Sequence, residues 1–161
     1  MESLAALGRV VGDLLKARKQ TLAVAESSAG GLINAALVAA PGASAYYLGG
    51  CVIYTGAGRS ALLGLTVQDM AGIRSASEPF ARLLAQRVRE RLGATWGLSE
   101  TGASGPTGNR YGDPPGHACI AVSGPIEVVI TVATGGADRE ANMRAFAHAA
   151  VELLESSLRR T

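Results

Sequence analysis

The spacing of apolar residues predicts helices and strands that alternate along the first half of the chain. Over residues 3–18, apolar side chains recur at helical intervals, at Leu4, Leu7, Val11, Leu14 and Leu15. Two short and almost continuously apolar runs, 21–25 and 49–55, are typical of strands covered on both faces of a sheet. A helical pattern follows the first run up to about Ala40, and a shorter one follows the second over 58–65. This order is that of repeated strand–helix units.

A longer helix and a third strand come next. The helix is predicted over 77–92, because Ser77 is a favourable N-cap and Pro79 stands just inside the first turn. The strand is predicted over 94–101. A loop rich in glycine and proline follows over 102–116, and the pattern favours neither a lid nor a rigid turn for it.

The chain closes with two strands and a long helix. Residues 117–124 and 126–134 are joined at Gly124-Pro125 and predict a hairpin. Residues 137–159 carry one broad apolar stripe of a helix. Strands alternating with helices predict an α/β fold, a three-layer α/β/α sandwich, and the hairpin makes its mostly parallel sheet a mixed one. Without a linker or repeat, we expect a single domain over 1–161.

Composition and charge narrow the class of protein. The 161 residues are 48% hydrophobic but only 4% aromatic, and 21 of them are glycine, which favours a closely packed α/β core. Fifteen basic and thirteen acidic residues leave a net charge of +2, too small to predict direct binding to nucleic acid. Charges among the first twenty residues argue against a signal peptide, and no apolar run approaches the ~18 residues of a membrane helix. We therefore expect a soluble cytoplasmic protein without membrane contact.

The joint between the first strand and its helix is the first candidate site. Ser27 and Ser28 stand where the strand ends, and Gly30-Gly31 follow them. Ligands of open α/β sheets gather at the carboxyl ends of strands, and glycine lets another group approach the backbone closely. The alternative is an ordinary capped turn, since serine and glycine are also common in helix caps and turns without a ligand.

Two further polar, glycine-rich loops strengthen the first interpretation. Residues 54–65 follow the second strand, and residues 101–108 follow the third. If the three strands are parallel, all three loops meet at one edge of the sheet. The chain carries no GxxxxGK[ST], no HExxH and no cluster of metal-ligand type, so we expect no metal and no cofactor. His117 is a weak candidate for substrate contact, and His148 fits a packing or surface residue.

Several segments together resemble the CinA C-terminal domain family, the competence/damage-inducible group that includes nicotinamide mononucleotide amidohydrolases. The family motif AESCTGG resembles the stretch from Ala25 to Gly31, AESSAGG. Further downstream, the family's PGSS…GG.V.Y, YSNxxKxxLLGV, TGIAGPxGG and GDRxxVR resemble PGASAYYLGGCVIY, YTGAGRSALLGL, TGASGPTGN and GADREANMR, in the same order. The likeness spans nearly the whole chain, and several motifs in register are far more specific than any one of them.

The resemblance implies a fold and a reaction. The implied fold is a three-layer α/β/α domain with a mixed sheet. The implied reaction is hydrolysis of the carboxamide of nicotinamide mononucleotide, which releases ammonia without a metal. By the same resemblance, Ser27 is the nucleophile, Tyr54 a polar aid, and the position of the family's lysine base is occupied by Arg59. Serine needs a neighbouring base to become a nucleophile, and N–H donors of the turns would stabilise the tetrahedral oxyanion.

The remaining substrate contacts are expected in the loops that carry the motifs. The catalytic set implied by the resemblance is Ser27, Tyr54 and Arg59. The substrate-binding set is Glu26, Ser28, Gly30, Gly31, Thr101, Gly102, Ser104 and Gly105. The expected partner is a small mononucleotide, and self-association into a homo-oligomer is common for small α/β domains.

Departures from the family pattern leave an alternative function open. Arg59 cannot act as a general base, because a guanidinium stays protonated in proteins. The family's Cys-Thr is Ser28-Ala29 here, and its Ser-Asn after the tyrosine is Thr55-Gly56. Either another base such as Glu26 or His117 replaces the lysine, or the chain binds a pyridine mononucleotide or a protein partner without hydrolysing anything.

Overall fold

One five-stranded sheet organises the computed structural model, which describes residues 2–161. The strands lie in the order β2-β1-β3-β4-β5, and their bounds are β1 Leu22–Glu26, β2 Tyr47–Val52, β3 Trp96–Ala103, β4 His117–Ser123 and β5 Val128–Ala133. β1 pairs in parallel with β2 and β3, whereas β4 pairs antiparallel with β3 and with β5. Four of the five strands therefore run in one direction, which confirms the predicted mixed, mostly parallel sheet.

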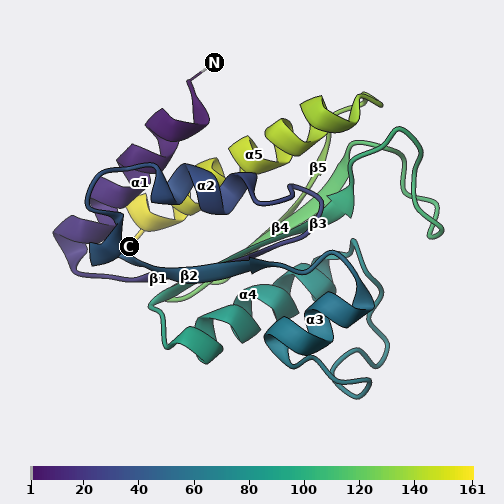
Figure 1. Ribbon diagram of the computed structural model, residues 1–161, viewed down its shortest axis with the longest axis horizontal. Coiled ribbons are helices and arrows are strands. Elements are labelled where there is room, and N and C mark those ends of the chain that lie inside the picture. The colour runs from purple at the N-terminus through teal and green to yellow at the C-terminus, as the bar shows by residue number, and fades with distance from the viewer. Residues whose placement is uncertain (1) are drawn as a thin grey trace.

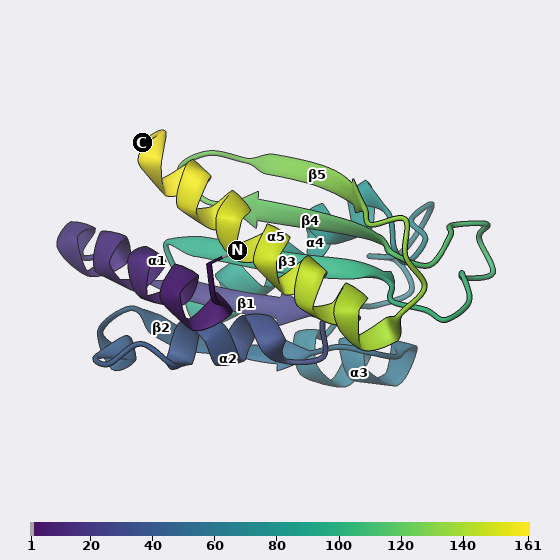
Figure 2. The same ribbon diagram turned by 90° about the horizontal axis from the view of Figure 1, so that it is seen from above.

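Helices cover both faces of this sheet (Figure 1). On one face lie α1 (Leu4–Arg18), α2 (Leu32–Val38) and α5 (Arg139–Arg159), which contact one another. On the other lie α3 (Gly56–Leu63) and α4 (Glu78–Leu92). Figure 2, seen from above, shows α1, α2 and α5 lying across the strands in the front layer. The predicted three-layer α/β/α sandwich is confirmed.

Alternate residues of β1 build two separate cores. Leu22 and Val24 belong to the larger core beneath α1, α2 and α5. Ala23 and Ala25 belong to the core between the sheet and the helices of the opposite face. Because side chains of a strand point alternately to its two faces, a strand covered on both sides needs apolar residues at every position. All five residues of β1 are buried, Glu26 included.

The third strand begins and ends two residues later than predicted, at Trp96 and Ala103. β3 continues through Gly102 to Ala103, where Ala103 pairs with His117 of β4. The sequence alone predicts a loop at the glycine and its neighbour, because their composition is typical of turns. The antiparallel partner supplies the reason for glycine at this place, since a Cβ on Gly102 would lie 2.8 Å from the Ala118 Cα. The helix expected up to Ala40 ends at Val38, and a 3-10 turn, η1, follows over Ala43–Ala45.

The described residues include neither a membrane-spanning helix nor a cluster of metal-ligand side chains. None of the helices within residues 2–161 is both long and apolar enough to cross a membrane. In the same range, no three His, Cys, Asp or Glu side chains are grouped to hold a metal ion.

Candidate functional site

A cavity lies at the carboxyl ends of β1, β2 and β3. Because these strands are parallel, the loops that follow them meet at one edge of the sheet, as expected from the sequence. The cavity has a volume of about 320 Å³. Its lining comes from the ends of all three strands, from α3 and α4 and from the long loop, and consists of Ser27, Ile53, Tyr54, Thr55, Gly56, Arg59, Ser75, Ala76, Phe80, Thr101, Gly102, Asn109, Arg110 and Tyr111.

A second, smaller cavity of about 210 Å³ adjoins the first. The two cavities share Tyr54, Gly102 and Asn109 in their walls. The remainder of the second wall is polar and basic, with Ser28, Ala103, Ser104, Gly105, Thr107, Gly108 and Arg139. The two adjacent serines therefore line different cavities, Ser27 the first and Ser28 the second.

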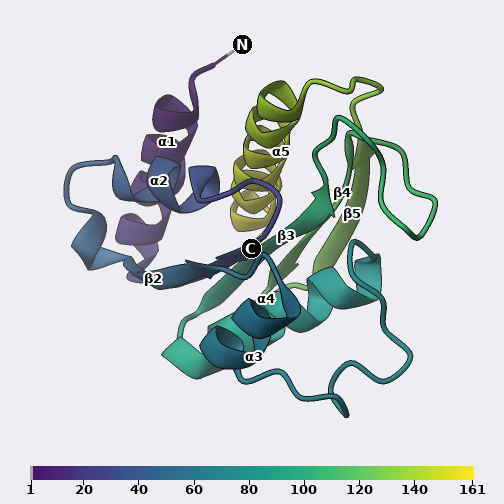
Figure 3. The same cartoon turned by 45° about the vertical axis from the view of Figure 1, so that its right-hand side comes forward.

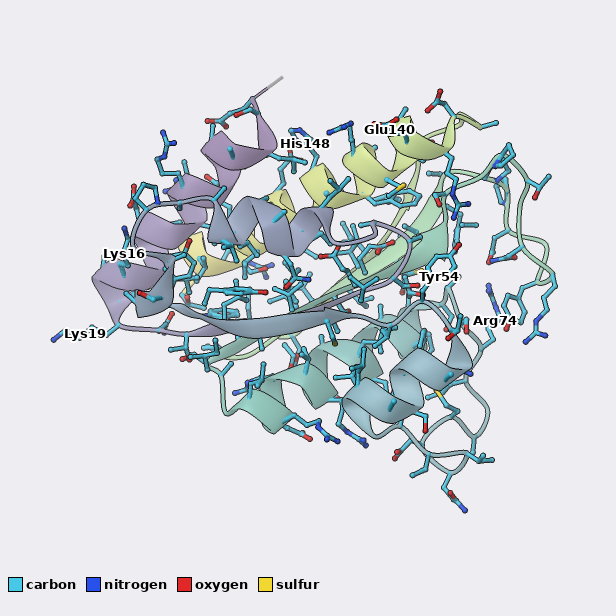
Figure 4. All side chains as sticks on the ribbon, in the orientation of Figure 1. Lys16, Lys19, Tyr54, Arg74, Glu140 and His148 are labelled. Atoms are coloured by element: carbon cyan, nitrogen blue, oxygen red, sulfur yellow. The ribbon has the colours of Figure 1, made fainter. Side chains whose placement is uncertain are left out.

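Arg59 forms part of the wall of the first cavity. Its guanidinium donates a hydrogen bond to Ser75 Oγ at 3.0 Å and lies 5.5 Å from the centre of the Phe80 ring. A guanidinium held in this way supplies a fixed positive charge rather than a proton acceptor. The chain's two lysines, Lys16 and Lys19, lie at the opposite end of the molecule from Tyr54 (Figure 4). No lysine therefore replaces the missing base.

Tyr54 connects the second strand with the last helix. Arg139, at the start of α5, donates to the Tyr54 hydroxyl oxygen at 2.6 Å and to the Gly105 carbonyl at 2.5 Å. Tyr54 is 58% exposed, so this bond rather than packing orients its ring. The arginine thereby places a positive charge in the wall of the second cavity.

Glu100 is the buried carboxylate of the site, and the sequence analysis did not identify it. Its Oε1 accepts hydrogen bonds from the backbone N–H groups of Ser27, at 3.1 Å, and Ala29, at 2.9 Å, while the Ser28 hydroxyl donates to Oε2. Burial, with a smaller effect from the negative charge of Glu26, raises the pKa of Glu100 and the three hydrogen bonds lower it, so that the pKa lies at about 7. The signal was present in the sequence, because a carboxylate interrupts an otherwise apolar and small-residue strand.

Glu26 is fully buried, and its carboxylate accepts hydrogen bonds from backbone N–H groups at the start of α2. Its Oε1 accepts from the backbone N–H groups of Gly31 at 2.8 Å and Ile33 at 3.2 Å, and its Oε2 accepts from both the backbone and the side-chain nitrogen of Asn34. Four donors occupy the carboxylate, which leaves no free lone pair directed at a substrate. Glu26, Gly30 and Gly31 are not among the described residues that line either cavity. The two glycines instead adopt left-handed backbone angles, with φ of 68° and 105°, that the turn requires.

Thr101 and His117 hold a strained residue in the cavity wall. Ala76 has a φ of 55°, an uncommon backbone conformation for any residue with a side chain. Its N–H donates to Thr101 Oγ1 at 3.2 Å, and its carbonyl lies 2.8 Å from His117 Nε2. Because a carbonyl oxygen only accepts, His117 Nε2 carries a proton and is the donor. His117 is thereby tied to Ala76 and is not among the described residues lining either cavity.

The long loop between β3 and β4 is braced rather than free. Figure 3 shows it projecting beyond the end of β3. Within it, Asn109 Nδ2 donates to Asp113 Oδ2 at 2.8 Å, and Arg74 reaches across from the segment before α4 to pair with Asp113 at 2.8 Å. The hydrogen bond from Arg74 lowers the pKa of Asp113. These contacts favour the rigid turn over the lid, and they place Arg110 and Tyr111 in the wall of the first cavity.

Comparison with known proteins agrees with this architecture. The family model described as CinA C-terminal domain matches residues 4–158. CinA-like proteins of Prochlorococcus marinus and Gloeobacter violaceus are 44% and 45% identical over 119 residues, which are 74% of this chain and 28% of each relative. The chain therefore spans less than a third of the length of the curated relatives that it matches.

Solved structures give the same result over almost the whole chain. A CinA superfamily protein from Escherichia coli has 26% identity and a TM-score of 0.88, over 96% of this chain and 90% of the other. A CinA superfamily protein from Klebsiella pneumoniae has 25% identity and a TM-score of 0.92, over 99% and 100%. Since the family model matches nearly every residue and the folds coincide, this chain belongs to the CinA C-terminal domain family.

Proposed function

We propose that the first cavity binds a pyridine mononucleotide. The supporting observation is that Arg59 and Arg110 bring two guanidinium groups into the same 320 Å³ cavity as Ser27 and Asn109. Guanidinium groups bind phosphate through paired, charge-assisted hydrogen bonds, and these two are held against aromatic rings of the same wall, Arg59 over Phe80 and Arg110 over Tyr111. The substrate class itself comes from the family resemblance.

Hydrolysis of the mononucleotide's carboxamide by Ser27 is the second candidate. It is favoured by the position of Ser27 in the same cavity, whose wall also includes Tyr54. It is opposed by the surroundings of the serine. Glu100 binds Ser27 through its backbone N–H, and within residues 2–161 no base is hydrogen-bonded to its hydroxyl. Binding without hydrolysis by Ser27 is therefore the function that the geometry supports best.

Calorimetric titration with nicotinamide mononucleotide tests the binding proposal. We expect Arg59→Ala and Arg110→Ala each to weaken binding about tenfold or more, because a hydrogen bond to a charged group contributes about 1.5–3 kcal/mol. Arg144→Ala is the matched control, since Arg144 lies on the exposed side of α5 and pairs with Glu140, away from both cavities. Absence of binding by the unmodified chain, or unchanged affinity in both variants, would refute the proposal.

Ammonia release from the same compound tests the role of Ser27. We expect Ser27→Ala to leave the rate of the unmodified chain unchanged, because no base activates this hydroxyl. A fall in the rate would establish Ser27 as the nucleophile. A gain of ammonia release in Arg59→Lys that disappears in the double variant with Ser27→Ala would show that the cavity lacks only a proton acceptor.

A further inference from the structure

The one serine hydroxyl of the site that contacts a carboxylate is Ser28, not Ser27. Among the described residues that line the two cavities, Ser28 alone donates its hydroxyl proton to a glutamate, at Glu100 Oε2. Ser28 is 5% exposed and lines the second cavity, which is where a reagent would meet it. A serine becomes nucleophilic when a neighbouring base takes its proton, and this contact has that arrangement.

The carboxylate is held so that one of its oxygens serves this hydroxyl. Glu100 Oε1 is occupied by two backbone N–H groups, from Ser27 and Ala29, which leaves Oε2 to Ser28. These bonds fix both the carboxylate and the turn that carries the serine. A general base must lie within hydrogen-bond reach of the proton that it removes, and the contact satisfies this condition before any substrate binds.

From this geometry we propose that Ser28 and Glu100 form a nucleophile–base pair for acyl transfer in the second cavity, acting on small esters or carboxamides. The inference goes beyond mononucleotide binding and does not depend on it. Arg139 lies in the wall of the same cavity, where its positive charge would stabilise the oxyanion of a tetrahedral intermediate. The volume of about 210 Å³ limits the acyl group to a few carbon atoms or a single ring.

The reaction balances with water as the only co-reactant. The Ser28 proton passes to Glu100 Oε2 while Ser28 Oγ bonds to the carbonyl carbon, whose π electron pair moves onto oxygen. When this pair returns, the bond to the leaving alcohol or amine breaks, and the leaving group takes the proton from Glu100. Water, deprotonated by the same carboxylate, then cleaves the acyl–Ser28 ester and restores both groups.

The state of Glu100 near neutral pH suits this role. A base with a pKa near the working pH is available in its deprotonated form and still accepts a proton readily. Burial raises the pKa of Glu100 to about 7. Among the described residues, the charged group acting on it is Glu26 of the neighbouring strand β1, and Arg139 lines the second cavity together with Ser28. The reaction rate should therefore rise with pH and level off above about 7.

Covalent labelling with diisopropyl fluorophosphate tests the pair without knowledge of the natural substrate. The Ser28 oxygen would bond to phosphorus as fluoride leaves, and the proton would go to Glu100. We expect one adduct per chain, mapped to Ser28 by mass spectrometry of its peptides. Glu100→Gln should slow labelling at least about 100-fold, the usual contribution of a general base.

The glutamine variant separates catalysis from structure. Its amide oxygen would still accept the two backbone N–H bonds and its amide nitrogen would donate to Ser28 Oγ, so the turn stays held while the base is lost. The matched control is Glu127→Gln, because Ser123 Oγ also donates to a glutamate, Glu127 Oε1, at 2.9 Å in the β4–β5 hairpin. We expect no adduct at Ser123 and no change of rate in this control.

Three outcomes would overturn the proposal. The first is labelling at Ser27 instead of Ser28. The second is no labelling of a chain that calorimetry and circular dichroism show to be folded. The third is labelling of Glu100→Gln at the rate of the unmodified chain. Unchanged labelling of Glu100→Gln would show that the hydrogen bond between Ser28 and Glu100 is only structural. Mononucleotide binding is measured separately, so its failure leaves this result unaffected, and the reverse also holds.

Discussion

Glu100 shows at the scale of one residue how a buried charge is kept in place. A carboxylate removed from water destabilises the folded chain unless donors surround it. Here the turn between β1 and α2 supplies three donors, two from its backbone and one from Ser28. These bonds do not offset the burial fully, because the pKa of Glu100 still lies at about 7 rather than at its ordinary value of 4.5.

The stability of the protein should therefore depend on pH through this residue. Since the folded state holds the Glu100 proton more tightly than the unfolded chain, its contribution is complete below pH 4.5, falls as the pH rises to 7 and is lost above it. The shift corresponds to a change on the order of 3 kcal/mol in the free energy of unfolding. Urea unfolding of the unmodified chain and of Glu100→Gln between pH 4 and pH 8 measures it.

The difference between the two chains isolates this residue from the other titrating groups. We expect the unmodified chain to lose stability relative to Glu100→Gln as the pH rises through this interval. A difference that does not change with pH would contradict the raised pKa.

Sequence reasoning reached part of this site and not the rest. The convergence of three loops, with Ser27 and Tyr54 in one cavity, follows from parallel strands and was predictable. The contact of Ser28 with Glu100 joins residues 72 positions apart and needs the exact order of the strands, with β1 beside β3. The sequence places Glu26 in the candidate site, but only the structure shows that four donors occupy its carboxylate.

At the scale of elements, the packing of α1 against α2 depends on a close contact between their backbones. Gly8 lies in the second turn of α1, where its missing side chain lets the carbonyl group of Ala36 in α2 come close. The helix itself was predictable from its apolar spacing, as were the other four helices and all five strands. The glycine contact was not, because glycine inside a helix carries no periodic signal and its partner lies 28 residues further along.

We expect Gly8→Ala to destabilise the protein although alanine favours helices. The added Cβ would overlap the Ala36 carbonyl, and overpacking of this kind costs about 1–3 kcal/mol. Gly58→Ala in α3 is the matched control, since its Cβ would lie at an ordinary 3.5 Å from Ile53 Cα. There the helical preference of alanine should stabilise by up to about 1 kcal/mol.

Urea midpoints of both variants measure the effect. Equal changes in the two would show that helical preference, rather than the close contact between α1 and α2, governs both positions.

At the scale of the whole molecule, the sheet joins two cores into one structure. Leu154 of α5 lies in the larger core and Leu84 of α4 in the smaller one, on opposite faces. The central strand β3 contacts both layers. It also carries Trp96, the chain's single tryptophan, which is fully buried and donates to Gln20 Oε1 at 2.9 Å.

This arrangement predicts cooperative unfolding of both cores. Leu154→Ala and Leu84→Ala should each lower the free energy of unfolding by about 2–5 kcal/mol, the usual effect of truncating a buried leucine. In both variants the loss of Trp96 fluorescence and the loss of far-ultraviolet circular dichroism should coincide, as in a two-state transition. Separate transitions in Leu84→Ala would show that the smaller core melts alone.

The scarcity of lysine has a practical consequence. Lys16 and Lys19 close α1 at the end of the molecule opposite Tyr54, which lines both cavities (Figure 4). Reagents that acylate ε-amino groups will therefore modify the protein at the end remote from the site. A sensor surface coupled through these two side chains will hold every molecule with its cavities toward the solution, so ligands can be screened on the immobilised chain without blocking their entry.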